Sequence, residues 1–306
     1  MLHSNTPLLR STPLSQLAGA NVWLKMDALQ ASGSFKLRGI GHACEHYARQ
    51  GATRLITSSG GNAGLAVAFS GRQLEIPVLV VVPETTSERA ITLLQQENAE
   101  VVVKGASWME ANSYAQTQIS TIDAFIHPFD DPVVWEGHAS LIKEVVEAGV
   151  QPDVVVLSVG GGGLLSGVHQ GLNDAGLFDV PILAVETEGA ASFRGSLINK
   201  KPITLDSVTT IATSLGAKKV CDQAYTLTQS RTVKSILVSD LQAVKACLGF
   251  VEDHRILVEP ACGASLAVIY EGRSEPKFYE NILVVVCGGA TATLDQLQNW
   301  STSLRP

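Results

Sequence analysis

A lysine at a loop-to-helix junction is the residue of this chain best placed for covalent chemistry. The small residues at positions 31–34 predict a loop, and Lys36 begins an apolar run with helical spacing. An amine that is partly shielded from water at such a junction can lose its proton near neutral pH and act as a Schiff-base nucleophile or a general base. A solvated helix lysine is the alternative that this segment alone leaves open.

Four consecutive glycines, Gly160, Gly161, Gly162 and Gly163, form a second candidate. They follow a predicted strand and precede a predicted helix, so their amides and the helix N-terminus can face an anion such as a phosphate. Glycine also lets the backbone approach a ligand closely. No Lys-Ser/Thr pair follows, which argues against a nucleoside triphosphate. A tight turn without a ligand is the alternative.

Polar groups at a second strand-to-helix junction, residues 58–64, suit a carboxylate. Ser59 and Asn62 can offer hydrogen bonds there beside exposed amides, although helix capping would explain the same residues. Cys287 ends the apolar strand 282–286, and Glu186 follows the strand 181–185. Both have ordinary alternatives, a buried structural thiol and a solvated carboxylate.

The elements that must position these residues alternate between helix and strand, which predicts an α/β fold with mostly parallel, twisted sheets flanked by helices. The strands are continuous apolar runs, as in sheets covered by helices on both faces. We expect a large domain from residues 1–31 and 133–306 and a small inserted α/β domain from residues 32–132. The expected helices are 37–50, 63–74, 87–98, 108–120, 133–148, 165–174 and 241–252, and the expected strands are 22–25, 54–57, 77–82, 100–103, 125–127, 154–159, 181–185, 225–228 or 236–238, 256–258 and 281–286.

Composition narrows the class of protein. With 45% hydrophobic and 17% charged residues among 306, the chain is unlike a disordered one, and its net charge of -7 disfavours a nucleic-acid partner. The apolar runs are shorter than the roughly 20 residues of a membrane helix, and residues 2–17 lack the pattern of a secretory signal, so we expect a cytoplasmic protein without a membrane partner. Five cysteines without C-x-x-C spacing indicate neither a disulfide framework nor a zinc site.

Four segments, in this order, resemble those of the fold type II pyridoxal-phosphate (PLP) enzymes, the tryptophan synthase β-subunit family. They are SGSFKLRG at 32–39, SSGGNAG at 58–64, GGGGL at 160–164 and CGG at 287–289. Within that family, ETEGAASF at 186–193 and ILVEPACGASLA at 256–267 are most similar to the catabolic L-serine dehydratases. The resemblance extends over nearly the whole chain. It implies a two-domain enzyme that converts L-serine to pyruvate and ammonia, accepts L-threonine to give 2-oxobutanoate, and forms a homodimer.

The same resemblance implies a role for each site residue. Lys36 would bind PLP and act as the base, while Ser59, Gly60 and Asn62 would bind the substrate. The cofactor-binding residues would be Phe35 and Ser214 on the two ring faces, Asn62 at the ring hydroxyl oxygen, Cys287 at the pyridine nitrogen, and Gly160, Gly161, Gly162, Gly163 and Leu164 at the phosphate. A monovalent cation, K+, would be held by Glu186, the Ser192 hydroxyl and the carbonyls of Gly160, Ala190, Leu215 and Ala217.

One departure from the family bears on the reaction. Serine racemases carry a serine where this chain has Gly60, and glycine has no proton to exchange. This favours elimination over racemisation and leaves Lys36 as the only obvious base. The alternatives are a serine racemase or a β-replacement synthase of the same fold, and, from another class, a PLP-binding protein with little catalysis.

Overall fold

Two mostly parallel sheets form the framework of the protein in the computed structural model, which describes residues 1–304. The six-stranded sheet has the order β1-β2-β10-β7-β8-β9, and the four-stranded sheet has the order β5-β4-β3-β6. Only the pairing of β1 with β2 is antiparallel among the described strands. The strands are β1 Leu8–Arg10, β2 Asn21–Lys25, β3 Arg54–Thr57, β4 Val78–Val82, β5 Glu100–Val103, β6 Asp123–Phe125, β7 Val154–Ser158, β8 Ile182–Thr187, β9 Val233–Val238 and β10 Asn281–Val285.

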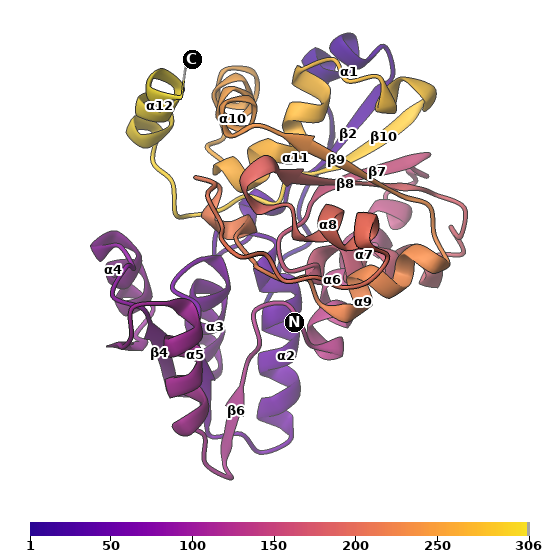
Figure 1. Cartoon of the computed structure of the whole chain (residues 1–306). Helices are drawn as coiled ribbons and strands as arrows, with labels where there is room; N and C mark the ends of the chain where they lie inside the picture. Colours follow the sequence, from indigo (N-terminus) through magenta and orange to yellow (C-terminus); the bar gives the residue numbers. More distant parts are fainter. Residues whose placement is uncertain (305–306) are drawn as a thin grey trace.

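Helices cover these sheets in two lobes (Figure 1). The four-stranded sheet and its helices form the smaller lobe, at the lower left of the view, and the six-stranded sheet lies in the larger lobe. The α-helices are α1 Thr12–Ala18, α2 Lys36–Arg49, α3 Asn62–Leu74, α4 Glu88–Gln96, α5 Trp108–Thr117, α6 Pro132–Glu147, α7 Gly163–Asp174, α8 Ser192–Asn199, α9 Asp222–Thr226, α10 Asp240–His254, α11 Pro260–Tyr270 and α12 Leu294–Ser303. The α/β class with mostly parallel sheets is therefore confirmed.

Burial explains why the strands are apolar throughout. Every residue of β4 and β7 is buried, because helices shield both faces of a parallel sheet. At the edge of the larger sheet, β9 alternates between buried and partly exposed residues instead. Continuous apolar runs were the signal that located the inner strands in the sequence.

The buried apolar residues form separate cores. The largest cluster draws its fully buried members from residues 14–26 and 141–297, and the second draws them from residues 37–134. The chain thus leaves the core of the larger lobe, builds the smaller one and returns. The domain boundaries at 31/32 and 132/133 stay predictions.

Several expected elements differ from those observed. Residues 256–258 are not a strand: they connect α10 to α11, and Val258 is buried without pairing in a sheet. The alternative strand 225–228 is helical, since α9 and the short 3-10 helix η4 (Leu227–Gln229) occupy it, and β9 is the strand. No helix or strand was predicted before residue 22, whereas the chain forms β1 and α1 there, and α8 and α11 were also missed. Short apolar runs carry too little periodicity to separate helix, strand and buried loop.

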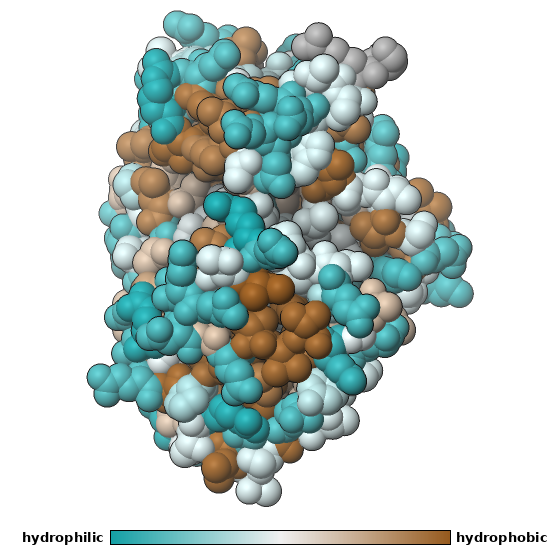
Figure 2. Space-filling model, turned by 90° about the vertical axis from the view of Figure 1, so that its left-hand side faces the viewer, coloured by the Kyte–Doolittle hydropathy of each residue, from teal (hydrophilic) through white to brown (hydrophobic). Residues whose placement is uncertain are grey.

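Hydrophilic and hydrophobic residues are mixed on the face shown in Figure 2, where hydrophobic residues gather in one patch over the smaller lobe and in another in the upper part of the view. The exposed large apolar side chains of that lobe include Val103, Trp108, Met109 and Ile122. Among residues 1–304, no helix combines the length and apolar character needed to cross a membrane.

Candidate active site

A cavity forms where the N-termini of α2, α3 and α7 meet the carboxyl ends of β7 and β10. All the residues predicted to bind the cofactor line it: Phe35, Lys36, Asn62, Gly160, Gly161, Gly162, Gly163, Leu164, Ser214 and Cys287. Ligands of open α/β sheets bind at this end of the strands. Segments far apart in the sequence thus meet in one place.

Lys36 is the first residue of α2, and its side chain reaches into the cavity. The residue is half-buried, and burial of the amine lowers the Lys36 pKa to about 8, although Cys287, Cys221 and Glu259 oppose that shift. At pH 7 roughly one amine in ten would then be neutral, against about one in 3,000 for an ordinary lysine. The amine can therefore serve as a nucleophile or a base near neutral pH.

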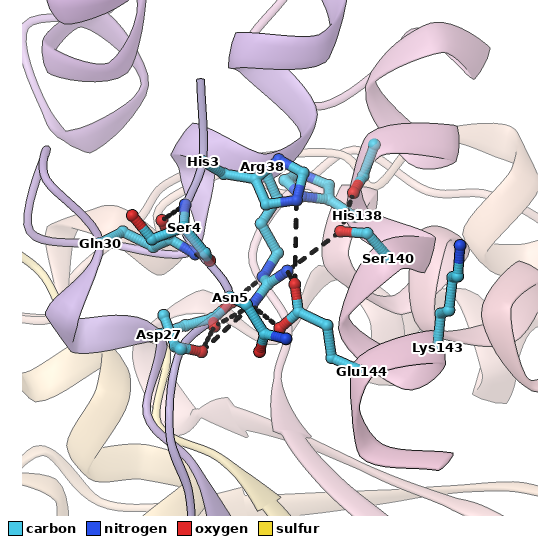
Figure 3. Close-up of polar contacts among 12 residues, drawn as sticks. His3, Ser4, Asn5, Asp27, Gln30, Arg38, His138, Ser140, Lys143 and Glu144 are labelled. Carbon is cyan, nitrogen blue, oxygen red and sulfur yellow. Dashed lines mark hydrogen bonds and ion pairs between the residues drawn. The ribbon is translucent and has the colours of Figure 1, made fainter. Parts of the chain in front are cut away.

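Arg38 anchors the first turn of α2, two residues after Lys36. Its guanidinium lies between two carboxylates (Figure 3): Nε and Nη2 donate to Asp27 at 2.7 and 2.8 Å, and Nη1 and Nη2 donate to Glu144 at 2.7 Å each. Lys25 pairs with Glu144 at 2.5 Å, so the buried cluster has two positive and two negative side chains. These contacts join β2, α2 and α6 and hold the start of the lysine helix.

The loop before Lys36 is also tied to the end of β10. Phe35 donates its backbone N–H to the carbonyl of Cys287 at 3.0 Å, and Gly289 donates to the carbonyl of Gly33 at 2.8 Å. The Phe35 ring lines the cavity and packs against His138, with ring centroids 4.9 Å apart. Two backbone hydrogen bonds therefore join the lysine segment to the thiol segment.

The glycine loop presents amides that the protein itself does not use. Within residues 1–304, none of the backbone hydrogen bonds has an amide of residues 160–164 as its donor. These amides precede or open α7, so they can grip an anion together with the positive end of the helix dipole. We call residues 160–164 the anion cup, and the binding of a phosphate there stays a prediction.

Contacts within the protein give a further reason for the glycines, beside the predicted approach of a ligand. A Cβ at Gly161 would lie 2.3 Å from the Phe129 ring, and one at Gly160 would lie 2.9 Å from the Ser214 carbonyl. Gly162 has φ of +90°, a conformation that side chains disfavour. Neighbouring protein atoms therefore already require glycine along this loop.

Asn62 is not a helix cap, because Gly61 holds that position in α3. Its Oδ1 accepts from the amide of Ala290 at 3.0 Å, and its Nδ2 donates to Glu259 at 2.8 Å and to Ser214 at 3.2 Å. The side-chain amide is thereby oriented with its N–H groups toward the cavity.

Glu259 is a site residue that our sequence reasoning missed. It is 3% exposed, lines the cavity, and also accepts from Thr291 at 2.5 Å. Burial raises its pKa, and hydrogen bonds from Ser214, Thr291 and Asn62 act against that rise. A carboxylate inside an otherwise apolar run just before Pro260 was the signal that could have revealed it.

Cys287 lines the cavity as a neutral thiol. A hydrogen bond with Cys262 and burial together raise its pKa well above the ordinary value. The Ser34 hydroxyl also lines the cavity and is buried without a hydrogen-bond partner among the described residues. An unpaired buried hydroxyl, a cradle of free amides and a lysine of low pKa fit a bound anion with a reactive carbonyl, so the residues present suit PLP.

Ser59 and Gly60, predicted to bind substrate, lie on the loop before α3 but do not line the cavity as it stands. Ser59 accepts a long hydrogen bond of 3.4 Å from the amide of Gly61. A Cβ at Gly60 would lie 2.9 Å from Thr86 Cγ2 and 3.1 Å from Val82 Cγ1. The space that a serine would occupy there is therefore largely filled.

Glu186 belongs to β8 rather than following it, which corrects its expected place. Its carboxylate accepts from the amides of Phe193 and Arg194 at 2.7 and 2.8 Å, at the start of α8. Burial raises the Glu186 pKa to about 7 despite these bonds. The Ser192 hydroxyl is buried and lacks a partner within residues 1–304. No group of three or more His, Cys, Asp or Glu side chains suited to a metal occurs in the described part of the chain.

The fold and the cavity together define a class: an α/β protein equipped for covalent lysine chemistry on a small anionic carbonyl compound. Comparison with known proteins makes the assignment specific. The family model described as "Pyridoxal-phosphate dependent enzyme" matches residues 1–288, and the chain belongs to this family.

Individual proteins show which members of this family the chain is similar to. The chain is 47% identical to the mouse protein "Serine dehydratase-like" over 99% of this chain and 95% of that one. It is 45% identical to the human "L-serine dehydratase/L-threonine deaminase" over 97% of this chain and 94% of that one. A solved fungal L-serine ammonia-lyase from Rhizomucor miehei superposes with a TM-score of 0.94 at 32% identity, covering 99% of each chain. The chain is thus a PLP-dependent enzyme homologous to L-serine and L-threonine ammonia-lyases.

Proposed function

We propose that the protein is an L-serine dehydratase (ammonia-lyase) that forms pyruvate and ammonia and also converts L-threonine to 2-oxobutanoate. The observation that carries the proposal is the position of Lys36, an amine with a pKa of about 8 in the same cavity as the unused amides of residues 160–164. The serine dehydratases among the relatives support the choice of substrate.

The cavity residues suit each demand of this reaction. PLP, when bound, supplies an electron sink that stabilises negative charge at the substrate Cα. Lys36 would hold PLP covalently and, once released, remove the Cα proton, because its lowered pKa leaves a usable neutral fraction. Asn62 would direct an N–H group at the ring hydroxyl oxygen. Cys287 stays neutral, so it offers the pyridine nitrogen no counter-ion.

Substrate orientation would fall to the loop of residues 58–61. Its Ser59 hydroxyl and backbone amides suit an amino-acid carboxylate. Because Gly60 carries no side chain, no proton donor stands there for delivery to the opposite face of Cα, which favours elimination over racemisation.

The test compares Lys36→Ala with Lys143→Ala, whose lysine is 75% exposed on α6. Both full-length proteins are incubated with PLP and then with the L- and D-forms of serine and threonine. We expect Lys36→Ala to lose the visible absorbance of lysine-bound PLP and all ketoacid formation, and Lys143→Ala to match the wild type. Ketoacid release by Lys36→Ala, or none by the wild type, would overturn the proposal.

We also propose that K+ binds beside Glu186, with oxygen ligands from Ser192, Gly160, Ala190, Leu215 and Ala217. Two observations support it: the Glu186 carboxylate is buried with only the amides of Phe193 and Arg194 as donors, and the Ser192 hydroxyl has no partner among the described residues. We further propose a homodimer that works in the cytoplasm. Light scattering of the purified protein and fractionation of cells test these two points, and a monomer or a membrane-bound pool would contradict them.

A further inference from the structure

The amine of Lys36 has a single hydrogen bond among the described residues, and its acceptor is a backbone carbonyl. Nζ donates to the carbonyl oxygen of Pro128 at 2.6 Å. Pro128 is buried in the connector between β6 and α6, 92 positions away in the sequence. Within residues 1–304 no carboxylate forms an ion pair with this amine. The amine also lies over the Phe35 ring, 5.2 Å from its centroid, so the Pro128 peptide group is its one hydrogen-bonding restraint among the described residues.

Two side chains hold that peptide group in place. His127 Nδ1 accepts from the amides of Phe129 and Asp130 at 3.3 and 2.7 Å, and the Phe129 amide belongs to the same planar peptide as the Pro128 carbonyl. The Trp135 indole N–H donates to the carbonyl of Phe129 at 2.7 Å. Because the Phe129 amide and the Pro128 carbonyl share one peptide plane, holding the Phe129 amide and the Phe129 carbonyl restricts the direction of the Pro128 carbonyl.

The same segment supports the glycine loop. The Phe129 ring packs against Gly161 so closely that a Cβ there would lie 2.3 Å from a ring atom. The His127 and Phe129 rings meet edge to face, with centroids 4.8 Å apart. Residues 127–130 thus connect the lysine to the anion cup, and a shift in one is transmitted to the other.

We propose that His127 and Trp135 are positioning residues for Lys36: they hold the Pro128 carbonyl as the acceptor that orients the lysine amine whenever it is free. This inference rests on the proposed function, in which the released amine takes up a proton. A buried ammonium without a partner would be costly, and a carbonyl acceptor lowers that cost. It also restricts a side chain with many rotamers to one useful position.

If His127 and Trp135 only stabilised the connector between β6 and α6, their replacement would lower thermal stability and leave the pKa of the Lys36 amine unchanged. A carbonyl that accepts from the amine stabilises its charged form, so loosening that carbonyl lowers the Lys36 pKa further. The pH dependence of PLP capture separates the two roles, because the neutral amine is the reacting form.

The experiment uses the full-length protein stripped of cofactor and measures the initial rate of visible absorbance growth after PLP addition, from pH 6 to pH 9. Trp135→Phe keeps an aromatic ring and removes the N–H. Its matched control is Trp23→Phe, since the indole N–H of Trp23 is buried without a partner in the described chain. His127→Ala removes the acceptor, whereas His127→Asn retains an oxygen that can accept from the same two amides.

We expect Trp135→Phe and His127→Ala to shift the midpoint of the profile down by about one pH unit, and to slow the plateau rate about tenfold, as loss of a hydrogen bond to a charged group predicts. Trp23→Phe and His127→Asn should keep the wild-type profile. Circular dichroism checks folding, and if Trp135→Phe does not fold, the two His127 variants carry the test.

An unchanged midpoint in folded Trp135→Phe and His127→Ala would overturn the inference while leaving the dehydratase proposal intact. Wild-type protein that captures PLP but forms no ketoacid would instead overturn the dehydratase proposal, and the capture profiles would still decide whether His127 and Trp135 position the lysine.

Discussion

Asn62 Nδ2 donates a hydrogen bond of 2.8 Å to Glu259 Oε1, across 197 positions of sequence. The asparagine comes from the smaller lobe and the glutamate from the larger one. Because Asn62 Oδ1 is taken by the Ala290 amide, its second N–H remains for Ser214 or for a ligand. The contact joins the two lobes at the cavity and sets the direction of the amide.

Replacing Glu259 by glutamine tests this relationship. The variant presents an NH2 group where two donors, Asn62 and Thr291, now meet oxygens, so one donor loses its acceptor. We expect PLP to bind about tenfold more weakly, the size of one lost hydrogen bond, with a shifted visible spectrum. Titration by absorbance measures both. Glu280→Gln, at a surface position, is the control, and unchanged affinity in Glu259→Gln would count against an orienting role.

The lowered pKa of Lys36 predicts a pH profile for cofactor capture. The neutral amine attacks the aldehyde, so the rate should rise about tenfold per pH unit below pH 7.5 and level off above about pH 8. Nα-acetyl-lysine in solution, with an ordinary amine, should keep accelerating beyond pH 9. Stopped-flow absorbance gives both curves, and a protein profile that follows the free lysine would show that burial does not perturb the amine.

The buried cluster around Arg38 predicts a large stability effect near the site. Replacing Arg38 by methionine leaves Asp27 and Glu144 with only Lys25 to balance two buried carboxylates. Loss of one partner of a buried ion pair costs about 3–5 kcal/mol. Arg54→Met, which breaks the partly exposed pair with Asp123, should cost about 1 kcal/mol or less. Urea unfolding of both variants measures the difference, and equal midpoints would contradict the expected contribution of burial.

The sequence predicts the strands and site residues of this protein best where a single segment determines the local structure. Apolar runs placed β3 and β5 at their observed residues, and the glycine run located a loop that lines the cavity. The resemblance located Lys36. The role of Pro128 could not be found in this way, because its carbonyl meets Lys36 from a segment 92 positions away. Glu259 left a sequence signal, but its partner Asn62 lies 197 positions away, and Trp135 reaches Lys36 only through the Phe129 and Pro128 peptides. The strand expected at 256–258 failed for a related reason: Val258 is buried by tertiary packing, not by strand pairing.

Glu186 predicts how stability depends on pH and potassium. Its folded-state pKa of about 7 lies above the ordinary 4.5, so the folded protein binds an extra proton between these values. The Glu186 contribution to stability is therefore present at low pH and is lost as pH rises through 7. Histidines with lowered pKa act in the opposite direction, so the difference between variants is the quantity to measure.

Melting temperatures at pH 6 and pH 8 test this account in KCl and in tetramethylammonium chloride. Glu186→Gln should flatten the pH dependence relative to the wild type, and K+ should raise the wild-type melting temperature at pH 8 by about 2–6 °C. The exposed neighbour Glu188→Gln is the matched control and should behave as the wild type does. Equal K+ stabilisation of Glu186→Gln would place the cation elsewhere.

The Thr86 side chain limits the size of the side chain that position 60 can hold. We therefore predict that two substitutions are needed to change the reaction from elimination to racemisation. Gly60→Ser alone places its Cβ 2.9 Å from Thr86 Cγ2, so the loop must shift and ketoacid formation should fall about tenfold or more without racemisation. Thr86→Ala removes the closest obstructing atom, and Val82 Cγ1, 3.1 Å from the added Cβ, then has to give way by only a few tenths of an ångström. The double variant can therefore present a hydroxyl near the substrate, and we expect it to convert L-serine to D-serine. Chiral chromatography of the remaining serine measures this, with Thr86→Ala alone as the control. D-serine from the wild type or from Thr86→Ala would show that another group already supplies the second proton.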